Sequence, residues 1–329
     1  MFNKLSYRFA LAIIAATSVL STPCYAVIGP QNDLKMSKRF QATATVQEHY
    51  QAGIDAVEAC RWDEVVMQFQ VVITSFPDSK YALESLYYLG IGYFYTGDYD
   101  FANQNLSLYL QMQTHPKHFY ETMQYKYAIA EQFGMGARCH LFGLHALPKW
   151  MDSTELAITI YDEIIAALPN DELAAKSMYA KARLHYQMKE YTESIDNYQN
   201  FIRRFPKNEL APDAYLGIAQ AYYCESLSQA NNPDIQGLAQ INLKRFRLDF
   251  PGDERIALAE EQLASMQETG AQVYLEMGYY YERIKHPEAS ILYYMTAIQQ
   301  FPNTQSAINA QNRIDLLKQK CPHLFAVAQ

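Results

Sequence analysis

The chain has 329 residues, of which 50% are hydrophobic and 27 are tyrosine, with only 13 glycines and 13 prolines. Its formal net charge of −8 argues against a nucleic-acid partner, because binding phosphates requires a basic face. No stretch shows sustained alternation of polar and apolar residues, so we expect no sheet.

The first 26 residues have the pattern of an export signal. Lys4 and Arg8 are basic, residues 9–20 form an uncharged apolar run, and Ala26 offers a small residue for cleavage. The run is short for a bilayer span, so we expect a signal that is removed. A retained anchor is the alternative. A polar tether, residues 27–45, follows.

Cys24 gives this segment a second interpretation. In bacterial lipoproteins a small residue directly precedes a cysteine that becomes the lipidated N-terminus. Here Pro23 takes that place, and Leu20 lies four residues ahead of the cysteine rather than three. We therefore favour ordinary cleavage after Ala26 and keep lipidation of Cys24 as the alternative.

A recurring proline organises the rest of the chain. Counted back from each proline, small and aromatic residues fall on the slots of a repeat of about 34 residues made of two helices. Small residues such as Gly278 at the eighth position let the helices approach closely, and the proline stops the second helix. The prolines follow apolar residues at Phe76-Pro77, Leu168-Pro169, Phe205-Pro206, Phe250-Pro251 and Phe301-Pro302, with a variant at His115-Pro116.

The sequence therefore predicts an all-α tetratricopeptide-repeat (TPR) α-solenoid of about six helical hairpins over residues 46–320. Two repeats fit only with insertions, an inserted loop at residues 134–151 and a shorter one at residues 228–235. A capping helix, residues 304–320, is expected to cover the last apolar face, and residues 321–329 form a tail.

Candidates for chemistry are few. His140 and His145 accompany Cys139 in the inserted loop, but their spacing matches no zinc motif, so we interpret them as loop residues. The sequence contains no phosphate-binding glycine loop, nucleophile elbow or zinc-protease helix. We expect no metal, no cofactor and no enzymatic activity.

The cysteines after Cys24 lie far apart in the sequence. Hairpins of a solenoid touch only their neighbours, so we expect no disulfides. Cys60 and Cys224 lie near the ends of first helices, where we expect buried thiols, and Cys139 is expected on the surface of the inserted loop.

The concave side of a TPR superhelix is the expected binding surface, and its positions can be counted within each first helix. In the N-terminal half these positions carry aromatic side chains: Tyr50, Tyr87, Phe94, Tyr95, Tyr125 and Phe133. The fourth repeat is more cationic there, with Lys176, Tyr179, Arg183, Tyr186 and Gln187. For any single aromatic residue, packing between hairpins is the alternative. Together they predict a surface for an extended or amphipathic peptide.

Two stretches carry a family resemblance. Residues 76–82 (FPDSKYA) lead into residues 89–102 (LGIGYFYTGDYDFA), and a C-terminal region contains GYYY at 278–281, EAS at 288–290 and FPNT at 301–304. With the export signal, these motifs resemble the BamD/ComL family, periplasmic TPR proteins of the outer-membrane β-barrel assembly machinery. The chain departs from that family in its Cys24 context, in the insertion at 134–151, and in having one hairpin more than is usual.

The resemblance implies a noncatalytic scaffold on the periplasmic side of a bacterial outer membrane. Its implied partners are the barrel-forming assembly protein and nascent barrel proteins. In the family, the N-terminal repeats are thought to engage substrate segments and the C-terminal repeats to dock the assembly protein. Two alternatives stay open. One is a generic periplasmic TPR adaptor or secretion chaperone that uses the same groove, and the other is a factor that recruits enzymes or remodels the envelope.

Overall fold

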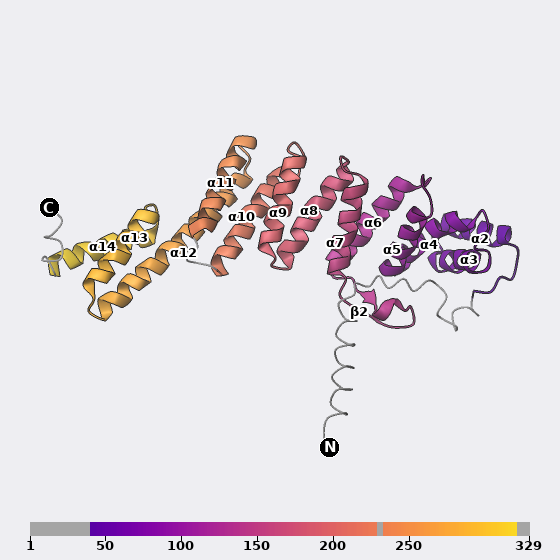
Figure 1. Ribbon diagram of the computed structural model, residues 1–329, viewed down its shortest axis with the longest axis horizontal. Coiled ribbons are helices and arrows are strands. Elements are labelled where there is room, and N and C mark those ends of the chain that lie inside the picture. Colours follow the sequence, from indigo (N-terminus) through magenta and orange to yellow (C-terminus); the bar gives the residue numbers. More distant parts are fainter. Residues whose placement is uncertain (1–39, 229–232, 321–329) are drawn as a thin grey trace, which may run out of the picture. The chain divides into compact units, whose positions relative to one another are not determined.

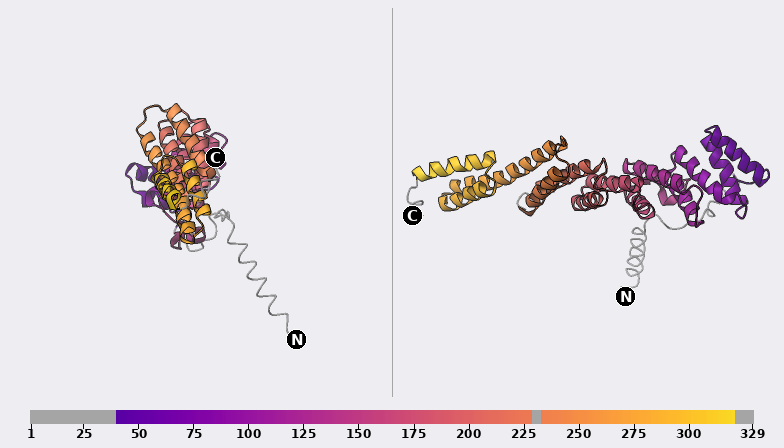
Figure 2. Two further views of the ribbon diagram at one scale, coloured as in Figure 1. Left: turned by 90° about the vertical axis from the view of Figure 1, so that its left-hand side faces the viewer. Right: turned by 90° about the horizontal axis from the view of Figure 1, so that it is seen from above.

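The computed structural model describes residues 40–228 and 233–320, and nearly all of the regular structure in them is helical (Figure 1). The chain divides into two compact units between Ile164 and Ile165. Within each unit, consecutive helices lie side by side as antiparallel hairpins, which can be followed in Figure 1 and in the right-hand view of Figure 2. The predicted fold, an all-α TPR solenoid, is confirmed.

The first unit holds three hairpins and the insertion. The last of its helices, α7, continues a few residues into the second unit. The insertion separates α6 from α7 and contains two short strands and one turn of 3₁₀ helix. The elements are α2 (Val46–Glu58), α3 (Trp62–Ser75), α4 (Ala82–Thr96), α5 (Tyr99–Gln111), α6 (Phe119–Gly134), β1 (Cys139–His140), η1 (Leu141–Gly143), β2 (Lys149–Met151) and α7 (Thr154–Ala167).

The second unit holds the next three hairpins and a C-terminal helix. Their helices are α8 (Glu172–Gln187), α9 (Tyr191–Arg204), α10 (Ala211–Ser228), α11 (Pro233–Asp249), α12 (Arg255–Arg283), α13 (Pro287–Gln300) and α14 (Gln305–Lys320). The capping helix expected at 304–320 is therefore present as α14. Its Ile314 and Leu317 pack with Tyr294 of α13 and Leu275 of α12.

The helix ends follow from local sequence chemistry. Thr45 and Glu48 form a capping box at the start of α2, each side chain accepting a hydrogen bond from the other residue's backbone N–H. The Asp171 carboxylate caps α8 by accepting from the N–H of Leu173. The second helices α3, α9, α11 and α13 all end directly before a Phe-Pro pair, as predicted.

Small residues bring the two helices of a hairpin into contact. A Cβ atom at Gly90 of α4 would lie 2.6 Å from Cγ of Leu106 on α5, and one at Gly53 would lie 2.7 Å from the Phe69 ring. Leu106 and Phe69 are fully buried. A Cβ atom at Gly278 of α12 would likewise lie too close to the Tyr294 ring of α13. These are the close approaches that the repeat slots predicted.

A buried lysine joins α5, α6 and α7. Lys126 is 1% exposed, and its ammonium group contacts Glu163 at 2.7 Å and donates hydrogen bonds to Asn103 and Ser107. Burial lowers the pKa of Lys126, and Glu163 opposes that effect. The α6–α7 hairpin is thus connected through long polar side chains, including a hydrogen bond from Tyr161 to Glu131.

Helix α12 is the largest addition to the sequence prediction. The repeat frames leave residues 252–270 unassigned, yet they belong mostly to one continuous helix of 29 residues. Its first half supplies Met266 and Ala259 to the cores around α10. Its second half supplies Leu275 to the core with α13 and α14. One helix therefore completes the packing of one hairpin and begins the next.

The expectation of no sheet was wrong at one small site. Strands β1 and β2 of the insertion pair antiparallel, with Cys139 opposite Met151 and an irregular register beside it. The ladder is too short to produce a visible alternation. It forms where His140 is held by Asp100 of α5 and Lys149 by the carbonyl of Gly97, directly after α4.

The cysteine expectations were partly wrong. Cys60 is exposed, since it follows the end of α2 in a left-handed conformation (φ 55°) that turns the chain into α3. Cys139 is buried, because the insertion packs its first strand against the first unit. Cys224 is partly buried on α10, and none of these three cysteines forms a disulfide. Cys24 and Cys321, like the expected signal and residues 27–39 of the expected tether, lie outside the described residues. The end of the tether is described, and there Phe40 is buried and Thr45 caps α2.

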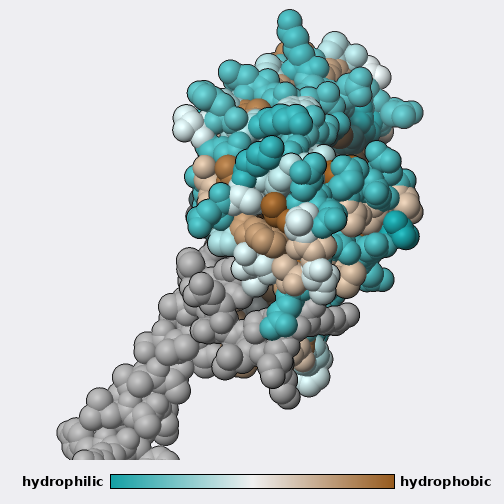
Figure 3. Space-filling view, turned by 90° about the vertical axis from the view of Figure 1, so that its right-hand side faces the viewer, coloured by the Kyte–Doolittle hydropathy of each residue, from teal (hydrophilic) through white to brown (hydrophobic). Residues whose placement is uncertain are grey.

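No helix in the described ranges is both long enough and apolar enough to cross a membrane. Viewed from the end at which α2 and α3 lie, the surface of the first unit is mainly hydrophilic with small apolar areas (Figure 3). Exposed side chains of this unit include Met67 and Tyr95.

Candidate functional site

Four aromatic residues of the first unit form a continuous set of ring contacts, here called the aromatic patch: Trp62, Phe94, Tyr95 and Tyr125. The Trp62 and Tyr95 rings are stacked, with centroids 4.1 Å apart and planes at 13°. Phe94 contacts both Tyr95 and Tyr125 edge to face, at 5.3 and 5.4 Å. The patch therefore links α3, α4 and α6, which belong to three successive hairpins.

One side of the aromatic patch is open to solvent. Tyr95 is 50% exposed, whereas Trp62, Phe94 and Tyr125 are partly buried. Burial, followed by a hydrogen bond with Tyr95, raises the pKa of Tyr125, so its hydroxyl stays protonated. The patch thus offers rigid aromatic faces with polar tips, which are features of peptide-binding surfaces.

The other aromatic residues predicted for the groove lie elsewhere. Tyr50 is partly buried and donates a hydrogen bond from its hydroxyl to Glu84 at 2.8 Å. Tyr87 is only 6% exposed and stacks on His118, with centroids 4.3 Å apart. Phe133 is 1% exposed and contacts Tyr99. The prediction that Tyr87 and Phe133 line an open groove is corrected, because these rings fill the space between hairpins.

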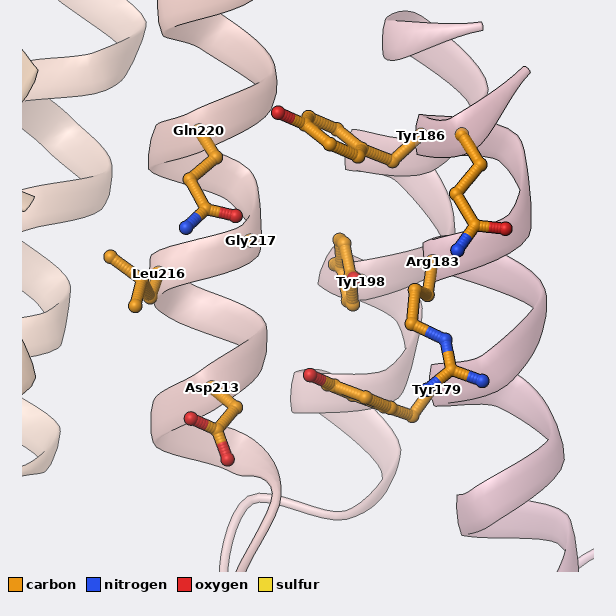
Figure 4. Close-up of a pocket in the computed structure, with 9 residues that line it drawn as sticks. Tyr179, Arg183, Tyr186, Tyr198, Asp213, Leu216, Gly217 and Gln220 are labelled. Atoms are coloured by element: carbon orange, nitrogen blue, oxygen red, sulfur yellow. The ribbon is translucent and has the colours of Figure 1, made fainter. Parts of the chain in front are cut away.

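The fourth repeat contributes a pocket in the second unit, here called the tyrosine–arginine pocket. It encloses about 330 Å³. Tyr179 and Tyr186 project from α8 toward α10, with Tyr198 of α9 at a level between them (Figure 4). The complete lining is Tyr179, Arg183, Tyr186, Gln187, Tyr198, Asp213, Leu216, Gly217 and Gln220. Tyr179 and Arg183, predicted as binding residues, therefore share one pocket, together with Tyr186 and Gln187.

The pocket has mixed polarity. The Asp213 carboxylate forms an ion pair with the guanidinium group of Arg255, with 2.8 Å between oxygen and nitrogen. This contact holds the carboxylate on the α10 side of the pocket. The Tyr186 hydroxyl forms a hydrogen bond with the sulfur of Cys224. This bond, together with burial, raises the pKa of Tyr186 to about 12. Burial also raises the pKa of Tyr179, with Asp213 adding to the effect and Arg183 opposing it. Neutral hydroxyls, one cation and one anion thus surround a small volume.

Counting concave positions did not identify every member of the two sites. Trp62 was missed because it begins a second helix, although a tryptophan directly after a helix turn could have indicated it. The α10 side of the pocket was also missed. Asp213, Gly217 and Gln220 recur at helical spacing on one face of α10, which was a readable signal.

The histidines of the insertion lie beside acidic side chains, His140 next to Asp100 and His145 next to Asp98. Among the described residues, no group of three or more histidine, cysteine, aspartate and glutamate side chains is arranged to hold an ion. The arrangement of both sites is instead suited to holding polypeptide, through ring contacts in one case and hydrogen bonds in the other.

Comparison with known proteins gives one family match. The tetratricopeptide-repeat profile matches residues 176–208, which include most of α8 and all of α9. No curated protein sequence matches the chain significantly.

Solved structures resemble this chain with low sequence identity and low TM-scores. A crystal structure of MamA has 18% identity and a TM-score of 0.39, covering 67% of this chain and 94% of that one. A TPR protein from Parabacteroides merdae has 13% identity and a TM-score of 0.36, covering 80% and 96%. The C-terminal part of a TPR protein from Cytophaga hutchinsonii has 14% identity and a TM-score of 0.39, covering 85% and 91%.

The fold itself rests on the hairpins, the glycine contacts and the matched repeat. The chain is a tetratricopeptide-repeat α-solenoid, a scaffold fold for protein–protein interaction.

Proposed function

We propose that the protein is a noncatalytic, exported scaffold that acts on the periplasmic side of an outer membrane and helps to assemble β-barrel proteins. The observation that carries this proposal is the aromatic patch. Tyr95 is half exposed and is held against Trp62, so the patch presents an ordered apolar surface on three successive hairpins. The resemblance to the BamD/ComL family supplies the proposed location and partners.

The patch suits an extended segment rich in aromatic residues. Strands of membrane β-barrels alternate apolar and polar side chains and carry aromatic girdles at both interfaces. Aromatic side chains of such a segment gain edge-to-face contacts with Phe94 and Tyr95, while the tyrosine hydroxyls stay hydrated. Ordered rings also reduce the conformational entropy lost on binding, because they are already in place.

The tyrosine–arginine pocket favours a second candidate function, a general periplasmic adaptor or secretion chaperone. Its Arg183, Asp213 and Gln220 match polar side chains of a peptide better than the apolar face of a barrel strand. The two candidates therefore differ in which of the two sites accounts for most of the binding.

Co-purification from detergent-solubilised envelopes tests the partner. A tagged full chain should recover a barrel-forming protein with repeated periplasmic domains, and the Phe94→Ala/Tyr95→Ala variant should recover less of its substrates. Lys318→Ala, an exposed change on α14, serves as the matched control. Recovery of soluble periplasmic proteins instead, undiminished in the patch variant, would favour the adaptor.

Processing tests the location. The mature chain should begin at Val27, or at Cys24 if that residue is lipidated. N-terminal sequencing combined with fatty-acid labelling distinguishes the two, since label that disappears in Cys24→Ser marks a lipoprotein. An intact Met1 in the mature protein would contradict both forms of the proposal.

A further inference from the structure

The insertion between α6 and α7 is held against the junction of α4 and α5. The backbone N–H of His140 donates to the Asp100 carboxylate at 2.9 Å, and the His140 ring nitrogen Nδ1 lies 2.9 Å from the same carboxylate. Lys149 contacts Asp98 at 2.8 Å and donates to the carbonyl of Gly97 at 2.7 Å. Both strands of the insertion are therefore attached at this junction.

His145, in the loop between the two strands, adds a third attachment. Its Nε2 lies 3.5 Å from the second oxygen of Asp98, and its side chain is 40% exposed. The ring packs against Phe101 of α5, with centroids 5.4 Å apart, and is nearly parallel to the His140 ring. The imidazoles of the insertion thus cover an aromatic side chain of α5.

The charged and titratable groups around His145 come from both sides of this contact. Asp98 and Asp100 face it from the α4–α5 junction, and Tyr93 of α4 lies 6.5 Å away between ring centroids. Lys149 and His140 face it from the insertion itself. Lys149 contacts one oxygen of the Asp98 carboxylate and His145 the other, and Nε2 of His140 lies 3.7 Å from the oxygen that Lys149 contacts. Of these two oxygens' partners, the half-exposed His145 is the one whose gain or loss of a proton near neutral pH changes the attraction that holds the loop.

We propose that the insertion, residues 134–151, is a pH-dependent latch. Protonated His145 fastens its loop to Asp98, and loss of that proton loosens the loop. Lys149 keeps the second strand attached in both states, so the change is a loosening of the insertion and not its complete release.

The direction of the pH dependence follows from the two partners. The hydrogen bond with Asp98 raises the pKa of His145 above its usual 6.5. Burial acts to raise the pKa of Asp98, but the contacts with His145 and Lys149 outweigh it and lower that pKa to about 2. Asp98 is therefore ionised throughout the neutral range. The His145–Asp98 attraction is complete below the usual histidine pKa and is lost as the pH rises through the raised value.

The chain offers a built-in reporter, because it has two tryptophans and one of them, Trp150, lies on β2. In a Trp62→Phe background, time-resolved fluorescence anisotropy reads the local motion of Trp150 alone. Between about pH 5 and about pH 9, the ratio of loose to fastened insertion should rise up to about fivefold, the range expected of one partly exposed ion pair.

Three variants in that background make the test decisive. His145→Gln should remove the pH dependence and behave as the parent does at high pH. His185→Gln, whose imidazole pairs with Glu190 in the second unit, should keep it. His140→Gln should keep it as well, provided that circular dichroism shows a folded chain.

The proposal is overturned if Trp150 motion is independent of pH in the parent, or if the dependence survives in His145→Gln. It is also overturned if zinc chloride at constant pH restricts Trp150 more than acidification does, since the cluster would then be a metal site.

Discussion

The aromatic patch and the tyrosine–arginine pocket use similar positions of the repeat for different chemistry. Phe94 and Tyr95 in the first unit, and Tyr186 and Gln187 in the second, occupy the same two positions of their first helices. In the patch these positions meet other aromatic rings. In the pocket they line the same cavity as Asp213, Leu216 and Gln220 of the next first helix. The repeat therefore fixes where a binding surface lies, and the neighbouring hairpin decides what it can bind.

The strongest way to disturb one region alone is to separate the helices beneath it. Gly90→Leu in α4 should lower the free energy of unfolding by about 3 kcal/mol or more, because the added side chain meets Leu106 and the helices must move apart. Denaturant titration followed by circular dichroism measures this loss.

Gly237 of α11 provides a control at a helical glycine with open space around it. A Cβ at this position meets nothing within 4 Å. Gly237→Ala should therefore stabilise the helix by about 0.5–1 kcal/mol, the difference in helix propensity. If Gly90→Leu were as stable as the parent, the helix register assigned to the first unit would be wrong.

A pair of double variants compares the two sites directly. Phe94→Ala/Tyr95→Ala should weaken binding of an aromatic-rich barrel-strand peptide by about 1–3 kcal/mol, as expected for interface anchors. Tyr179→Ala/Arg183→Ala should leave that affinity nearly unchanged, because these residues line the other site. Isothermal titration calorimetry gives both affinities.

Melting curves of the same proteins separate binding from folding. Phe94→Ala/Tyr95→Ala should retain its helical content, since Tyr95 is half exposed. A large loss of stability without a separate binding defect would show that these rings serve packing between hairpins. A folded variant that binds as tightly as the parent would remove the patch from the proposed function.

Charge provides a finer comparison. Arg183→Gln should weaken binding of an acidic peptide by about 1 kcal/mol at low salt, and the difference should shrink as salt screens the exposed guanidinium. Binding of the aromatic-rich peptide should not respond to this change. Fluorescence polarisation at several salt concentrations tests both statements, and an equal effect on the two peptides would mean that they share one site.

The smallest expected effect concerns a hydroxyl at the pocket. Tyr186→Phe removes the contact with Cys224 at 3.3 Å. Sulfur is a weak hydrogen-bond partner, so the free energy of unfolding should change by no more than about 0.5 kcal/mol. Thermal denaturation checks this. A loss several times larger would show that the contact is important for the packing of α8 against α10.

By itself the sequence determined the hairpin repeat. The Phe-Pro pairs and the small residues at the eighth position act within a single hairpin, where stopping a helix and admitting a close neighbour are local effects. The structure accordingly confirms the ends of α3, α9 and α13 and the contacts of Gly53 and Gly90. The second half of α12 and the capping helix α14 were readable for the same reason.

Only the tertiary structure decided which side chains are accessible and what the insertion does. Tyr87 and Tyr95 are both expected on the concave side, yet His118 covers the first while the second stays half exposed. Cys139 is buried because the insertion folds back onto Asp98 and Asp100, some 40 residues earlier in the chain, whereas Cys60 is exposed in the turn after α2. The helical period decides on which face of a helix a residue lies. How far its side chain is buried depends on the size and position of neighbours that are distant in sequence.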